Sequence, residues 1–231
     1  MATELFLAMT RAEISRSFSL PPKIGWMACH FSPYALGLSN LPTILPADSL
    51  LMVNDVTPIH GHDPEVIAQQ LSSCVQRLQC SGVLLDFQRL ENEETAALAA
   101  FLVKQLPCPV IVSEGYSANI DCPILLPPLP HHVPLEEYIA PWQGRDIWLE
   151  VAMDAEALLV TESGVAISSL LHSIPEGGYE DPALHCHYRM ELSDNSARFT
   201  LWRTKEDIDT LLKEAEEKMI TAAVGLYQEF R

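Results

Sequence analysis

Short apolar segments recur along the chain, and most are followed by turn residues or by an amphipathic helix. Several are apolar on both faces, which is typical of parallel strands that are covered by helices. The repeated order of strand, helix and strand predicts a parallel α/β architecture. The eight segments are IGWMACHF (24–31), SLLMVND (49–55), GVLLDFQ (82–88), PVIVSEG (109–115), CPILLPPL (122–129), DIWLEVAM (146–153), ARFTLWRT (197–204) and TAAVGLYQEF (221–230).

Three helices are predicted from capping residues followed by an apolar stripe. Asp63 before Pro64 begins the first, Asn92 begins the second, and Thr204 with Asp207 begins the third. The stripes expected to face the core are Ile67, Leu71, Cys74, Val75 and Leu78; Ala97, Leu98, Phe101, Leu102 and Leu106; and Ile208, Leu211, Leu212, Ala215 and Met219.

Eight strands in 231 residues fit an irregular (β/α)8 TIM-type barrel. It is irregular because some crossover helices are missing: residues 116–121 and 127–134 are too short or too rich in proline to form one. An open doubly wound sheet is the alternative. We expect a single barrel-like domain over residues 1–231 and leave open an N-terminal extension of residues 1–22.

Two further patterns affect the strand count. Residues 146–170 are compatible with an antiparallel hairpin that turns at Asp154 and Ala155, and HYRMEL with ARFTLWRT is compatible with a second hairpin around SDNS. The segment ELFLAM near the N-terminus is a ninth candidate strand. The count is therefore uncertain by one.

The charge balance limits the partners. Lys and Arg number 14 against 31 Asp and Glu, which gives a formal net charge of −17. Such a chain repels phosphate backbones and anionic lipids, so we expect neither nucleic acid nor membrane as a partner. The N-terminal apolar run is broken by Glu4 and resembles neither a signal peptide nor a spanning helix, so cytoplasmic residence is expected.

No cofactor is expected. The sequence has no phosphate loop, no Rossmann glycine fingerprint and no Gly-x-Ser-x-Gly turn. Its six cysteines form no CxxC pair, so we expect them to be reduced rather than to bind zinc.

Function in a barrel gathers where the strands end at their carboxyl side. Polar and aromatic residues at the predicted strand ends therefore form a candidate rim, suited to a sugar or another polar ligand. The residues that we select from this rim, together with Trp26 as a candidate aromatic wall, are Asn54, Asp55, Asp86, Gln88, Glu114, Tyr116, Trp202 and Tyr227.

The stretch from Asp63 to Leu106 resembles the helix, strand and helix around the catalytic strand of family 18 glycoside hydrolases, the chitinase-like barrels. The family signature is DGxDxDxE, and residues 81–88 here are SGVLLDFQ. Gly82, Asp86 and the aromatic Phe87 match. Ser81 and Leu84 replace the first two aspartates, and Gln88 stands in the place of the glutamate. No counterpart of the SxGG or MxYD strands of the family is found.

The resemblance implies that Asp86 orients the acetamide of an amino sugar, while the missing glutamate would protonate the glycosidic oxygen. A carboxamide cannot exchange a proton at neutral pH, and general acid catalysis is typically worth about 10² to 10⁴ in rate. We therefore expect a non-hydrolytic, chitinase-like protein that binds an amino-sugar glycan through Asp86 and Gln88.

Alternatives remain. Glu114 after the next strand could pair with Asp86 in a glycoside hydrolase. His60 and His62 have a spacing that metal ligands sometimes use, which would give a metal-dependent hydrolase. His131 and His132 follow a proline-rich loop and are expected at the surface. A scaffold without a small-molecule site is the third class.

Overall fold

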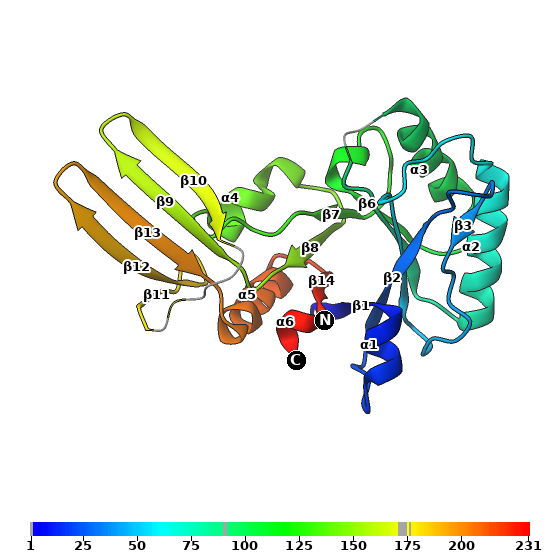
Figure 1. Cartoon of the computed structure of the whole chain (residues 1–231), viewed down its shortest axis with the longest axis horizontal. Coiled ribbons are helices and arrows are strands. Elements are labelled where there is room, and N and C mark those ends of the chain that lie inside the picture. Colours follow the sequence, from blue (N-terminus) through cyan, green and yellow to red (C-terminus); the bar gives the residue numbers. More distant parts are fainter. Residues whose placement is uncertain (1, 90–91, 171–174, 176) are drawn as a thin grey trace.

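The computed structural model describes residues 2–89, 92–170, 175 and 177–231, and it contains a closed barrel of eight parallel strands (Figure 1). Strand β1 pairs in parallel with both β14 and β2, which closes the barrel. The predicted TIM-type fold is confirmed. In barrel order the strands are β1 (Glu4–Met9), β2 (Ile24–Phe31), β4 (Leu50–Asn54), β5 (Gly82–Asp86), β6 (Val110–Ser113), β7 (Ile124–Leu126), β8 (Ile147–Val151) and β14 (Ala222–Leu226).

The helices around the barrel are uneven in length. Two long helices, α2 (Pro64–Leu78) and α3 (Glu93–Gln105), flank β5, and α5 (Lys205–Glu217) precedes β14. The chain from β6 to β7 makes only the short 3-10 turn η1, as expected from the short crossover there. The remaining elements are α1 (Arg11–Arg16), α4 (Leu135–Ile139), η2 (Ala140–Trp142), α6 (Tyr227–Phe230) and the two-residue strand β3 (Leu38–Ser39), which pairs antiparallel to β2. No described helix is long and apolar enough to cross a membrane.

The predicted caps begin the three long helices. The side chain of Asp63 accepts a hydrogen bond from the Glu65 N–H, and that of Asn92 accepts one from the Thr95 N–H. Thr204 and Asp207 form a reciprocal capping box at the start of α5. The prediction for Met219 is wrong: α5 ends at Glu217, and the Met219 side chain is 86% exposed.

A five-stranded antiparallel sheet is inserted between β8 and α5. Figure 1 shows it projecting to one side of the barrel. The predicted hairpin of HYRMEL and ARFTLWRT is confirmed as β12 and β13. In sheet order the strands are β10 (Gly164–Leu170), β9 (Ala155–Thr161), β13 (Ser196–Trp202), β12 (Cys186–Ser193) and β11 (Tyr179–Asp181).

Two strand assignments need correction. Residues 146–170 form no hairpin across Asp154 and Ala155, because β8 pairs with barrel strands and β9 pairs with β10 and β13. The segment at 197–204 belongs to the inserted sheet and not to the barrel. Residues 4–9, within the range 1–22 predicted as a possible N-terminal extension, supply the eighth barrel strand instead.

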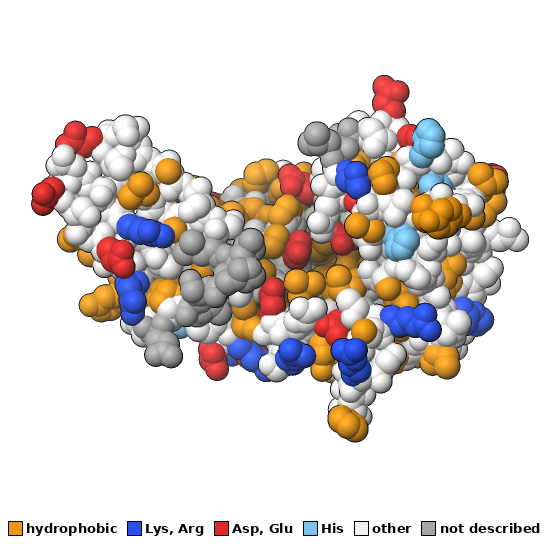
Figure 2. All heavy atoms as spheres, in the orientation of Figure 1, with side chains coloured by type: hydrophobic (Ala, Val, Ile, Leu, Met, Phe, Trp, Pro, Cys, Tyr) orange, Lys and Arg blue, Asp and Glu red, His pale blue; other side chains and the backbone are white. Residues whose placement is uncertain are grey.

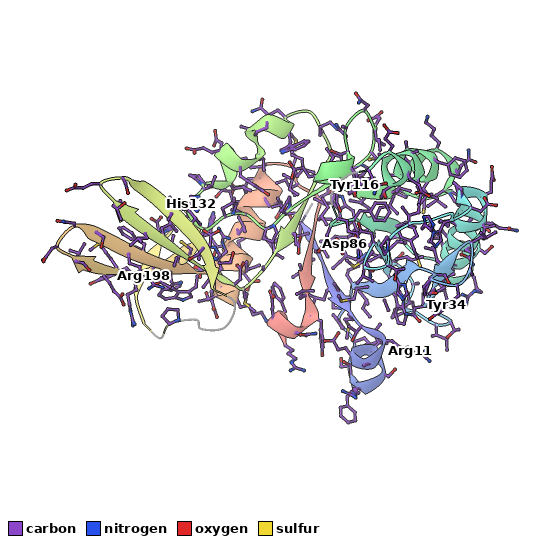
Figure 3. All side chains as sticks on the ribbon, turned by 45° about the horizontal axis from the view of Figure 1, so that its top comes forward. Arg11, Tyr34, Asp86, Tyr116, His132 and Arg198 are labelled. Carbon is purple, nitrogen blue, oxygen red and sulfur yellow. The ribbon has the colours of Figure 1, made fainter. Side chains whose placement is uncertain are left out.

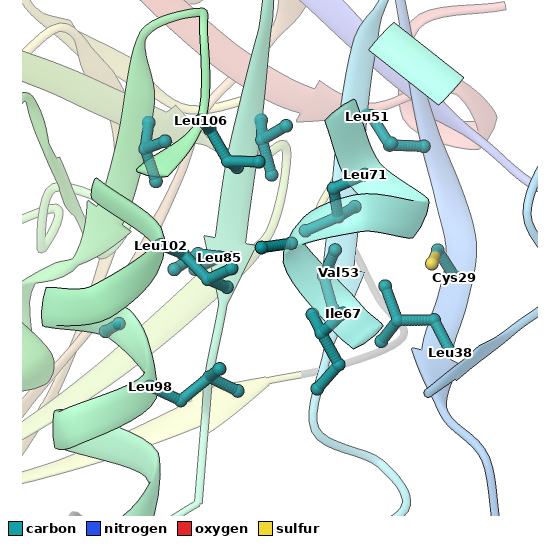
Figure 4. Close-up of a cluster of buried hydrophobic side chains, with 14 of the residues drawn as sticks. Cys29, Leu38, Leu51, Val53, Ile67, Leu71, Leu85, Leu98, Leu102 and Leu106 are labelled. Carbon is teal, nitrogen blue, oxygen red and sulfur yellow. The ribbon is translucent and has the colours of Figure 1, made fainter. Parts of the chain in front are cut away.

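Apolar side chains fill both faces of the barrel strands. One cluster lies inside the barrel and includes Phe6, Met52, Leu84 and Ile111. A larger cluster lies between the strands and helices α2 and α3 (Figure 4). This double burial explains the near-continuous apolar runs in the sequence. All six cysteines are free, and Cys29, Cys74, Cys122 and Cys186 are buried.

Candidate functional site

A cavity of about 480 Å³ opens at the carboxyl ends of β5, β6, β7 and β8. Asp86 and Tyr116 lie close together at this end of the barrel (Figure 3), and acidic side chains surround the hollow between the barrel and the inserted sheet (Figure 2). The residues that line the cavity combine polar and apolar groups: Asp86, Phe87, Gln88, Arg89, Ser113, Glu114, Gly115, Tyr116, Leu125, Pro127, Pro128 and Glu150.

Asp86 is the last residue of β5, two positions beyond Leu84 of the interior cluster, so its side chain shares the inner face of the strand. The Nε2 of Gln88 donates a hydrogen bond of 3.1 Å to Oδ1 of Asp86. Burial raises the pKa of Asp86, the charge of Asp55 adds to this shift, and the Gln88 hydrogen bond opposes it. The site therefore presents a partly desolvated carboxylate whose one oxygen is already bound by an amide.

Asp55 positions the loop that carries Gln88. It is 5% exposed, and its two carboxylate oxygens accept hydrogen bonds of 3.0 Å from the backbone N–H groups of Gln88 and Arg89. The Nε of Arg89 also donates to the backbone oxygen of Asp55 at 2.7 Å. Asp55 thus faces the loop backbone and lies outside the cavity lining.

Tyr116 and Phe87 are 2% and 3% exposed, and their rings pack against each other in the core outside the barrel strands. Their ring centroids lie 5.5 Å apart in an edge-to-face arrangement, and the Tyr116 hydroxyl donates to the Arg89 backbone oxygen at 2.9 Å. The backbone N–H of Phe87 donates to Oγ of Ser113 on β6 at 3.1 Å. The loop after β5 is therefore fixed to neighbouring elements.

The structure brings Glu114 to the same cavity as Asp86, as the sequence suggested. It adds Glu150, which sequence reasoning missed. Burial, with the charges of Asp86, Glu229 and Asp154, raises the pKa of Glu150 to about 7. The sequence signal that points to Glu150 is a single acidic residue between apolar ones in the strand IWLEV.

Four other candidates lie away from the cavity lining. Trp26 is 6% exposed in the outer core and donates from Nε1 to the Asn40 oxygen. Trp202 lies on β13 of the inserted sheet, stacked on His187. Tyr227 lies in α6, where its hydroxyl is 3.3 Å from Oγ of Ser17. The Asn54 amide donates to the Met27 oxygen and its Oδ1 accepts from the Val56 N–H.

The ring of His62 has a structural role, and His60 contributes its backbone N–H to it. The Nδ1 of His62 accepts from the His60 backbone N–H at 2.9 Å, and its Nε2 lies 2.9 Å from the Ser32 oxygen. Both ring nitrogens of His62 are therefore occupied by backbone groups. Within the described ranges, no cluster of three or more His, Cys, Asp or Glu side chains could hold a metal ion.

His131 was expected at the surface, but it is 1% exposed beneath the inserted sheet. Its Nε2 lies 3.4 Å from Oδ1 of Asp154, and its backbone N–H donates to Oε2 of Glu156 at 3.2 Å. The prediction that His131 is exposed is wrong. The inserted sheet, which is formed by residues later in the chain, covers this proline-rich loop.

Comparison with known proteins found no matching family model and no matching curated protein. Solved structures do match. A class V chitinase from Nicotiana tobaccum in complex with NAG4 has a TM-score of 0.63 at 7% identity over 97% of this chain and 93% of its own. A family 18 N-acetylglucosaminidase from Paenibacillus barengoltzii gives 0.62 at 11% identity over 98% and 95%.

The spore cortex-lytic enzyme SleL of Bacillus cereus matches with a TM-score of 0.58 at 8% identity, over 96% of this chain and 70% of its own. Identities this low establish the fold alone. The chain therefore has the barrel fold of family 18 chitinases and chitinase-like proteins, over nearly its full described length.

Proposed function

We propose that the chain binds an amino-sugar glycan in the cavity at the carboxyl ends of β5 to β8. The observation that carries the proposal is the Asp86–Gln88 pair in that cavity. The Nicotiana chitinase of the same fold was solved with NAG4, which supports a carbohydrate ligand. A concave site with a few convergent polar groups on an apolar lining is the common form of a small-ligand pocket.

The pair offers complementary groups for an acetamide. One oxygen of Asp86 accepts from Gln88, which leaves the other oxygen to accept a hydrogen bond from a ligand N–H or hydroxyl. The carboxamide oxygen of Gln88 can accept a further bond. Leu125, Pro127 and Pro128 add apolar surface to the lining beside these polar groups.

Residue 88 itself cannot drive cleavage. The resemblance of residues 81–88 to the family signature implies that Gln88 stands where the family has its proton-donating glutamate, and a carboxamide cannot release and regain a proton at neutral pH. Binding is therefore the function that the Asp86–Gln88 pair supports best. A glycoside hydrolase using Asp86 with Glu114 is the second candidate, because both carboxylates line the cavity.

Calorimetry with N-acetylglucosamine tetramer tests the proposal. We expect saturable binding to the wild type and at least about tenfold weaker binding to Asp86→Ala, which removes a charged hydrogen-bond acceptor. The matched control is Asp194→Ala, at an exposed position of the inserted sheet. Absence of binding to the wild type at millimolar ligand would refute the proposal.

A further inference from the structure

We propose that Glu150 is the proton donor with which this cavity cleaves a glycan, in place of the acid that position 88 lacks. This inference rests on the proposed glycan binding. It concerns a residue outside the segment that resembles the family signature, on a different strand of the barrel. Asp86 is its partner across the cavity, on β5, while Glu150 is on β8.

The strand alternation aims Glu150 into the barrel. Ile147, Leu149 and Val151 of β8 pack outward in the cluster beneath the helices, whereas Trp148 packs inward and stacks on Phe6. Side chains two residues apart on a strand share a face, so Glu150 points inward above Trp148. Its place one residue from the end of β8 puts it at the rim where the cavity opens.

Glu150 and Asp86 line the cavity from well-separated strands, with β6 and β7 between them in the barrel. A ligand in the cavity therefore lies between two carboxyl groups, which is the arrangement that glycoside hydrolysis commonly needs. Within the described ranges, no hydrogen bond or ion pair ties up the Glu150 carboxyl, so it is available to a ligand.

The environment of Glu150 favours its protonated form, so that a substantial fraction of the carboxyl groups carries a proton at neutral pH. Glu150 is half-buried, and the nearby charges are mostly negative. A general acid works best when its pKa lies near the working pH, and the pKa of about 7 for Glu150 meets this condition. The titratable groups that face it or line the same cavity are Asp86 on β5, Arg89 after β5, Glu114 on η1, Tyr138 on α4, Asp154 after β8 and Glu229 on α6.

The reaction balances with water as the second substrate. The acetamide oxygen of the bound sugar attacks C1 while the C1–O glycosidic bond breaks, and the Glu150 proton passes to the leaving oxygen. Asp86 accepts a hydrogen bond from the acetamide N–H and stabilises the charge that develops there. Water then attacks C1 and gives a proton to the Glu150 carboxylate, which releases the acetamide and restores the acid.

Glu114 is the competing donor in the same cavity. It begins a three-residue 3-10 turn, whereas Glu150 lies within barrel strand β8 and is paired with Val224 of β14. A catalytic group is positioned more precisely on a rigid element than on a turn. Glu150 is therefore the better candidate for the proton donor.

The test measures binding and cleavage separately in the full chain. Hydrolysis of a fluorogenic chitobioside and calorimetric binding of N-acetylglucosamine tetramer are compared for the wild type, Glu150→Gln, Glu114→Gln and an exposed control, Glu191→Gln. We expect Glu150→Gln to lower kcat by about 10²-fold or more while the Kd changes less than about threefold. The wild-type rate should fall as pH rises above about 7.

The outcomes separate the two proposals. No binding by the wild type contradicts the proposed function. Binding without wild-type hydrolysis overturns the role of Glu150 and leaves binding intact. Loss of hydrolysis in Glu114→Gln but not in Glu150→Gln assigns the proton to Glu114 and also overturns the inference. Thermal unfolding of each variant confirms that the lost activity is not lost folding.

Discussion

The side-chain amide of Gln88 donates a hydrogen bond of 3.1 Å to the carboxylate of Asp86. A glutamine can hold this bond at any pH, whereas a glutamate could donate it only when protonated. The pair is thus a fixed hydrogen-bonding unit at the edge of the cavity. Its chemistry suits recognition of a polar ligand, and any proton transfer must come from another residue.

A glutamate at position 88 should restore an acid. Gln88→Glu places a second carboxyl about 3 Å from Asp86, and two such groups tend to share one proton, which raises one pKa. In the Glu150→Gln background, we expect Gln88→Glu to raise chitobioside hydrolysis by about 10²-fold. Adding Asp86→Ala to this variant should abolish the gain. An inert Gln88→Glu variant that still binds glycan would show that residue 88 is misplaced for catalysis.

The loop after β5 should depend on Asp55. Asp55→Asn keeps one oxygen acceptor but turns an N–H₂ group toward a backbone N–H, so one of the bonds to Gln88 or Arg89 is lost. We expect a loss of about 1 to 3 kcal/mol in the free energy of unfolding and weaker glycan binding.

The matched control for Asp55→Asn is Asp63→Asn at the N-cap of α2, where Asp and Asn cap about equally well. Urea denaturation measures both variants. Equal stability of the two would mean that Asp55 does not hold the loop.

Glu150 should make stability fall as pH rises. Its pKa is raised from 4.5 to about 7 in the folded chain, so between these values the folded state binds more protons than the unfolded state, and the free energy of unfolding decreases with pH. Glutamine does not ionise, so Glu150→Gln removes this decrease in the free energy of unfolding. We expect the variant to exceed the wild type by about 1 to 3 kcal/mol at pH 8 and to match it near pH 4.

Urea denaturation at the two pH values tests this expectation, with Glu191→Gln as the exposed control. A Glu150→Gln variant that is less stable than the wild type at pH 8 would contradict the raised pKa of Glu150.

Arg203 should anchor the inserted sheet to the barrel. Its side chain is 2% exposed, and it donates to the backbone oxygens of Leu129, Pro130, Leu184 and His185. Arg203→Met leaves these oxygens without donors, so we expect a loss of about 3 to 5 kcal/mol.

Arg198 is an exposed arginine close by on β13, and it provides the control for Arg203. Arg198→Met should change the free energy of unfolding by less than about 0.5 kcal/mol. Similar losses in both variants would contradict the anchoring role.

Local signals in the sequence predicted the part of the fold that depends on nearby residues. The caps Asp63 and Asn92 and the apolar stripes behind them place α2 and α3 correctly, because capping and helix amphipathicity act within a few residues. Met219 failed for a local reason as well, since its backbone adopts a positive φ of 65° just past the end of α5.

Pairing between distant residues could not be predicted in this way. An apolar run such as ARFTLWRT is the same sequence whether it joins a barrel or an inserted sheet, and only its partners β9 and β12 decide. The place of β1 in the barrel is not evident from the sequence for the same reason. One of its two partner strands, β14, lies near the other end of the chain.

The residues of the candidate site also differ in whether local sequence could predict them. Asp86, Gln88, Glu114 and Tyr116 lie at or just after the carboxyl ends of barrel strands that the sequence predicts correctly, and they line one cavity. Trp202 belongs to a segment predicted as a barrel strand, whereas in the structure it ends β13 of the inserted sheet. Glu150 was missed because its neighbours in IWLEV suggested a buried strand, and the inward direction of its side chain appears only when the barrel closes.

The most direct measurement is a crystal structure of the chain soaked with N-acetylglucosamine tetramer. We expect electron density for a sugar in the cavity between Asp86 and Glu150, with its acetamide hydrogen-bonded to the Asp86 carboxylate. An empty cavity at saturating ligand, or a sugar bound only elsewhere on the protein, would contradict the glycan-binding function.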